Sequence, residues 1–137
     1  MPLPNVHEAL IYLMVVTSAS DRDMAHLELG RIGDVVKTWP IFEDFESHKL
    51  INVAQECQEL LRGNDGLDRV LSLAHDVIPT RLRDTAYAAV MEVAVADREM
   101  RIEEARILQR VREALEIDPL SVAAIEMASK ARVRTLT

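Results

Sequence analysis

Two short acidic stretches of the sequence have residues that could bind a metal ion. Residues 21–28 and residues 97–104 share the pattern D-R-[DE]-M-x-x-x-E at an offset of 76 residues. Carboxylates are the ligands that hard cations such as Mg²⁺, Ca²⁺ and Mn²⁺ prefer. The repeat therefore makes four acids candidate ligands of a divalent cation, namely Asp21, Glu28, Asp97 and Glu104.

The four acids differ in how well a helix tolerates them. Each aspartate follows an apolar helix, where the helix dipole is negative and an acid costs up to about 1 kcal/mol. Each glutamate falls in the first turn of the next helix, where the dipole favours an acid. The aspartates therefore need a partner, and two alternatives are open: a bound cation, or local backbone N–H groups together with Arg22 and Arg98.

The hydrophobic pattern predicts helices and no strand. The expected helices cover about residues 5–16, 26–37, 47–61, 67–77, 80–96, 101–115 and 119 onward. The first is apolar all round, so it should be buried, and it begins with a capping box formed by Asn5 and Glu8. Phe42 and Phe45 lie in a connector and should close an edge of the core. The sequence thus predicts an all-α fold, a compact bundle of about seven helices.

The acidic repeat also predicts a symmetric arrangement. Each acidic stretch joins an apolar helix to an amphipathic one, so the chain contains two similar helix–loop–helix units. We expect these units to be pseudo-symmetric, with the first and fifth helices side by side. The two acidic loops would then lie near one another and form one anionic pocket.

Length, charge and cysteine content narrow the class of protein. The chain of 137 residues has the size of one domain, over residues 1–137, and a net charge of −7. It has no basic stripe for a phosphate backbone, so we expect no nucleic-acid binding. The longest uncharged run, residues 9–20, is about half of a bilayer span, so we expect no direct membrane insertion. Cys57 is the single cysteine, and an unpaired thiol favours the cytoplasm.

Other residues that could bind a metal ion or react have a simpler interpretation. His75-Asp76 is the dipeptide of some metal phosphohydrolases, but no further set of His and Asp at helical spacing accompanies it, so His75 is predicted to be a polar residue on a helix face. Cys57 lies on an apolar stripe and is predicted to be core. His26 is a weaker candidate ligand, and it also excludes an EF-hand because it occupies the sixth loop position, which requires glycine. No P-loop or dinucleotide-binding glycine motif is present.

At the repeat, the chain resembles the TerB-like family, the helical domain of bacterial tellurite-resistance proteins, which also occurs beside J-domains in some membrane-anchored co-chaperones. The resemblance spans nearly the whole chain in helix count and order. It rests on Ala96-Asp97-Arg98-Glu99 with Glu104, and on Ser20-Asp21-Arg22-Asp23 with Glu28. It implies a single TerB-like helical domain and a metal site built from Asp21, Glu28, Asp97 and Glu104.

Three functions are open on these grounds. The first is a non-enzymatic module that holds a divalent cation or docks a partner protein, in a bacterial stress response of the tellurite-resistance type. The second is a helical protein–protein interaction scaffold without metal, in which the acids only cap helices. The third is a metal-dependent hydrolase, which needs a general base or an oxyanion donor that the sequence does not reveal. The missing catalytic constellation favours the first.

Overall fold

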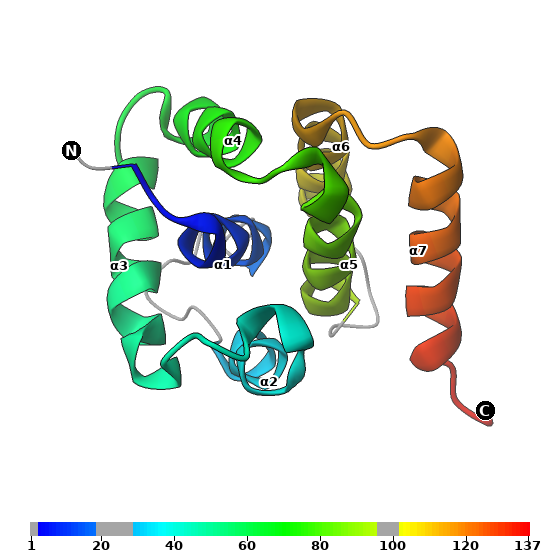
Figure 1. Ribbon diagram of the computed structural model, residues 1–137. Coiled ribbons are helices and arrows are strands. Elements are labelled where there is room, and N and C mark those ends of the chain that lie inside the picture. Colours follow the sequence, from blue (N-terminus) through cyan, green and yellow to red (C-terminus); the bar gives the residue numbers. More distant parts are fainter. Residues whose placement is uncertain (1–2, 19–28, 96–101) are drawn as a thin grey trace.

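A computed structural model describes residues 3–18, 29–95 and 102–137 (Figure 1). Within these ranges the chain forms seven α-helices and no strand: α1 (Val6–Ser18), α2 (Gly30–Thr38), α3 (Leu50–Leu61), α4 (Gly66–Val77), α5 (Arg83–Ala94), α6 (Ile102–Leu115) and α7 (Pro119–Arg132). Three short 3-10 helices lie between them, namely η3 (Pro40–Phe42), η4 (Ser47–Lys49) and η5 (Thr80–Leu82). The predicted all-α bundle is confirmed.

α1 lies at the centre of one half of the bundle. Its residues from Ala9 to Thr17 are all buried, and it packs against α3, α4 and α5 (Figure 1). A helix that is apolar on every side must be enclosed, as the sequence predicted. The predicted capping box is also present: the backbone N–H of Asn5 donates to Glu8 Oε1 at 2.9 Å, and that of Glu8 donates to Asn5 Oδ1 at 2.8 Å.

The helices form two similar groups of three around the pair α1 and α5. These two helices pack against each other, α3 flanks α1 on one side, and α7 flanks α5 on the other (Figure 1). α2 contacts α5 as well as α1, and α6 contacts α1 as well as α5. α1 and α5 thus lie side by side, as predicted, and the contacts of the pair α1–α2 are matched by those of the pair α5–α6.

The outer helices of the two groups differ in burial. α3 has five buried residues and also contacts α4. α7 has a single buried residue, Ser129, and packs mainly on α5. The pseudo-symmetry therefore fails at this edge of the molecule, where α7 presents most of its surface to solvent.

The connector between α2 and α3 closes one edge of the core, as predicted. Phe42 is buried and Phe45 is half-buried. The ring of His7 in α1 lies against both, at centroid distances of 5.4 Å and 5.5 Å, and its Nε2 is 2.7 Å from the carbonyl oxygen of Ile41. These contacts attach the connector to the start of α1.

Two helices begin later than the sequence suggested. Leu29 precedes α2, which therefore starts at Gly30 rather than near residue 26, and residues 26–28 lie outside the described ranges. Glycine destabilises a helix mainly in its interior, so a glycine at the first position is compatible with this start. α5 starts at Arg83 rather than at residue 80, because residues 80–82 form η5.

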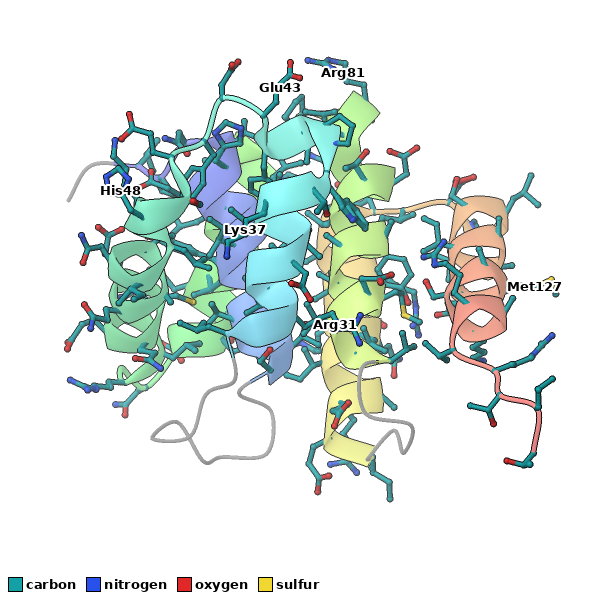
Figure 2. All side chains as sticks on the ribbon, turned by 90° about the horizontal axis from the view of Figure 1, so that it is seen from below. Arg31, Lys37, Glu43, His48, Arg81 and Met127 are labelled. Carbon is teal, nitrogen blue, oxygen red and sulfur yellow. The ribbon has the colours of Figure 1, made fainter. Side chains whose placement is uncertain are left out.

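The apolar stripe along α6 is only partly buried. Leu108, Val111 and Leu115 are buried, but Ile102 is 70 % exposed and Ala105 is also exposed. The first turn of α6 extends past the end of α5, at the lower side of Figure 2. These two residues are exposed because no described helix reaches that far.

Arg83 joins the ends of three helices. Its guanidinium donates to the carbonyl oxygens of His75 at 3.0 Å, Ile78 at 3.2 Å and Leu115 at 3.2 Å, at the C-terminal ends of α4 and α6. Carbonyl groups there lack intrahelical donors, and a cation suits the negative end of the helix dipole. The side chain is 15 % exposed, so these hydrogen bonds are largely shielded from water.

Gly66 begins α4 where the chain turns back after α3. A Cβ atom at this position would lie 2.6 Å from Leu61 Cα and 2.7 Å from the carbonyl oxygens of Leu60 and Leu61, which are backbone atoms. At Gly63, in the same turn, the nearest atom to a Cβ would be Leu60 O at 3.8 Å, an ordinary contact. The close approach of the two helices therefore requires glycine at 66 and not at 63.

Cys57 belongs to the core, as predicted. Its side chain is fully buried on α3, and its Sγ lies 3.7 Å from the carbonyl oxygen of Tyr12. Burial raises the pKa of the thiol to about 12. The reactive thiolate is therefore nearly absent at neutral pH.

We expect Gly66→Ala to lower the free energy of unfolding by about 1–3 kcal/mol, because the added methyl group overlaps backbone atoms of α3. Urea denaturation followed by circular dichroism measures this. Gly63→Ala is the matched control and should change the free energy of unfolding by less than about 1 kcal/mol. Equal losses in the two variants would show that the close approach at residue 66 is not what requires glycine.

Replacing Arg83 by Met should lower the free energy of unfolding by about 2–3 kcal/mol, because three shielded carbonyl groups lose a charged donor. Arg81→Met removes the same charge from the exposed part of η5 and should cost no more than about 0.5 kcal/mol. Denaturation curves of both variants against the wild type provide the comparison. If the two variants unfold alike, the junction of α4, α5 and α6 does not depend on this guanidinium.

The native protein should react with a disulfide reagent such as Ellman's reagent at about pH 8 only as fast as it unfolds, because the Cys57 thiol is buried and protonated. In urea the same reagent should modify one thiol per chain at once. Absorbance of the released thiolate measures both rates. Immediate modification of the folded protein would contradict the buried position.

Candidate functional site

Four helix ends meet at one end of the bundle. α1 and α5 pack against each other and run in the same general direction, so that both end at the lower side of Figure 2, where α2 and α6 begin. These are the helix ends that flank the two acidic stretches of the repeat. The described chain therefore leads into and out of both stretches at the same end of the molecule.

The structure describes one of the four predicted ligands. Glu104 lies half-buried in the first turn of α6 beside Glu103, where the positive end of the helix dipole favours an acid. Asp21, Glu28 and Asp97 lie outside the described residues, as does His26. In the described ranges no group of three or more His, Cys, Asp or Glu side chains is arranged to hold a metal ion.

Glu92 is the only charge in the apolar second half of α5, and it is engaged with two arginines. Its carboxylate accepts a hydrogen bond from Arg132 Nη2 at 3.1 Å and lies 3.8 Å from Arg31 Nη1. Arg31 extends from the first turn of α2 toward α5 in Figure 2, and Arg132 is the last residue of α7. Glu92 thus connects α2 and α7 to α5.

His75 is a polar residue on the face of α4, as predicted. Its Nε2 lies 2.9 Å from Glu116 Oε2 and its Nδ1 lies 3.2 Å from Asp76 Oδ1. The hydrogen bonds to Asp76 and Glu116 raise the pKa of His75, because both carboxylates favour the charged imidazole. The ring lines a groove of about 660 Å³ between α4 and α6, which also contains the ion pair of Arg110 and Asp68. The ring makes hydrogen bonds to carboxylates here rather than the ligand set of a phosphohydrolase.

A polar triad that the sequence did not reveal fastens α7 to the bundle. The Tyr87 hydroxyl on α5 donates to Glu126 Oε2 on α7 at 2.6 Å. Arg112 Nη1 on α6 donates to the same carboxylate oxygen at 3.1 Å and to the Tyr87 hydroxyl at 3.0 Å. Burial and the bond to Glu126 raise the pKa of Tyr87 to about 12. A tyrosine within the apolar stretch of α5 was the only sequence signal, because partners 25 and 39 residues away cannot be read from spacing.

No helix within the described ranges is long and apolar enough to cross a membrane.

Comparison with known proteins identifies the family. No curated protein and no solved structure matches the chain significantly. The family model described as tellurite resistance protein TerB matches residues 7–127, which extend from the first turn of α1 into α7. The all-helical order and the paired units of the bundle agree with the resemblance that the acidic repeat indicated. The chain therefore belongs to the TerB family of tellurite resistance proteins.

Proposed function

We propose that this chain is a non-enzymatic TerB domain that binds a divalent cation, Ca²⁺, Mg²⁺ or Mn²⁺, in a bacterial stress response of the tellurite-resistance type. The observation that carries the proposal is the shared position of the helix ends that flank both copies of the acidic repeat. The proposed ligands are Asp21, Glu28, Asp97 and Glu104.

The chemistry of this donor set suits a hard cation. Four carboxylates brought close together repel one another unless a cation or several arginines neutralise them. The two aspartates follow α1 and α5, whose negative helix ends disfavour an acid, so a bound cation would relieve both costs. The described member of the set, Glu104, lies in the first turn of α6, and this helix begins at the same end of the bundle.

A helical scaffold without metal is the second candidate function. The exposed apolar residues on α7 favour it, since Leu120 is 79 % and Met127 is 71 % exposed. For either function we place the protein in the cytoplasm, because the single cysteine is unpaired and buried, as suits a reducing compartment.

We expect Ca²⁺, Mg²⁺ or Mn²⁺ to release or absorb heat on titration and to raise the melting temperature. A ligand at 100 times its dissociation constant stabilises the native state by about 2.7 kcal/mol. Asp97→Asn and Glu104→Gln should each reduce this stabilisation, because each removes a charged ligand. Isothermal titration calorimetry and thermal melts with and without EDTA measure both effects.

The matched control is Glu113→Gln, an exposed acid on the same helix as Glu104, which should leave the metal response unchanged. Absence of heat and of any melting shift at millimolar metal would rule out the cation. A metal response that persists in both ligand variants would place the cation elsewhere.

A further inference from the structure

The outward face of α7 is apolar along its whole length. At 100° per residue, six exposed positions fall on this face, which we call the α7 face: Leu120, Ala123, Ala124, Met127, Ala128 and Ala131. Figure 2 shows Met127 directed away from the bundle at its outer edge. A helix on the surface of a globular protein ordinarily carries polar residues on its outward side.

The side of α7 that faces the bundle is already occupied. Val122 and Ile125 pack against the core, Ser129 is buried, and Glu126 is held by Tyr87 and Arg112. The apolar residues of the α7 face therefore cannot turn inward without breaking these contacts. They remain available to another molecule.

The two ends of α7 carry opposite charges. Asp118 precedes the helix, and Lys130 and Arg134 lie at its end. When two copies of this helix pack antiparallel, the acidic end of each lies beside the basic end of the other. Parallel packing would instead bring like charges together. The charge pattern thus selects a second copy of this chain as the occupant, in the antiparallel orientation.

We propose that two copies of this protein associate through the α7 face with their α7 helices antiparallel. Leu120 and Met127 are seven residues apart, and Ala123 and Ala124 lie midway between them. With a two-fold axis through the alanines, Leu120 of each copy packs against Met127 of the other. The small alanine side chains let the two backbones approach at the crossing point. Such an interface is isologous and complementary to itself.

The area of the α7 face sets the strength of the dimer. One pair of helices buries less than the about 1,600 Å² of a standard protein–protein interface. The dimer is therefore weak and forms as the protein concentration rises. It does not depend on the proposed cation, so it is tested in EDTA.

Analytical ultracentrifugation between about 1 µM and about 1 mM protein covers the range expected for a weak interface. The mass of the wild type should rise from 15.4 kDa toward twice this value. Leu120→Glu and Met127→Glu should each weaken association by about tenfold or more, because each places a charge in the apolar centre. Ile51→Glu is the control, since Ile51 is 58 % exposed on α3, the pseudo-symmetric counterpart of α7.

Charge reversal tests the orientation. Asp118→Lys and Lys130→Glu should each weaken the dimer, and the variant with both changes should recover the affinity of the wild type, because the ends of the two copies are then complementary again. Circular dichroism checks that each variant is folded. A wild type that stays monomeric throughout, or a dimer that survives both glutamate substitutions, would overturn the proposal. A double variant no stronger than the single ones would overturn the antiparallel arrangement.

Discussion

The enclosure of α1 is the constraint on which the rest of the bundle depends. Nine consecutive buried residues leave this helix no side that can face water. Burying a Leu, Ile, Val or Met side chain stabilises the folded state by about 1.5–3 kcal/mol. Other helices must therefore pack against α1 on every side. α3, α4 and α5 are those neighbours, and α5 is itself buried over most of its second half. Packing two such helices together places their ends at one end of the molecule.

Polar interactions join the parts of the bundle that apolar packing leaves separate. Arg83 binds carbonyl groups at the ends of α4 and α6. Glu92 links α5 to α2 and α7, and the triad around Tyr87 holds α7 against α5 and α6. Glu92, Arg112 and Glu126 lie at the margins of the core, where a charged group keeps partial access to water and its desolvation cost stays small. They determine how the outer helices are positioned more than how the core is packed.

The two regions proposed to bind other molecules follow from the pseudo-symmetry in opposite ways. The proposed cation site depends on the symmetry, because both units end and begin their helices at one end of the bundle. The α7 face results from a failure of the symmetry, because α4 covers α3 and no described element covers α7 in the same way. A domain built from two similar units can thus carry one shared site and one unmatched surface.

Several features could be predicted from the sequence, because periodicity, caps and short motifs are local properties. They are the helix content, the buried first helix, the capping box, the buried cysteine and the family. For the candidate site the sequence determined which acids could be ligands, and the structure adds the position of Glu104 and of the flanking helix ends. Only the tertiary structure determined that Arg83 binds His75 and Leu115, that Tyr87 meets Glu126, and that Ile102 is exposed. Those features depend on contacts between residues far apart in the chain, and the spacing of residues along one helix carries no information about which distant helix will lie beside it.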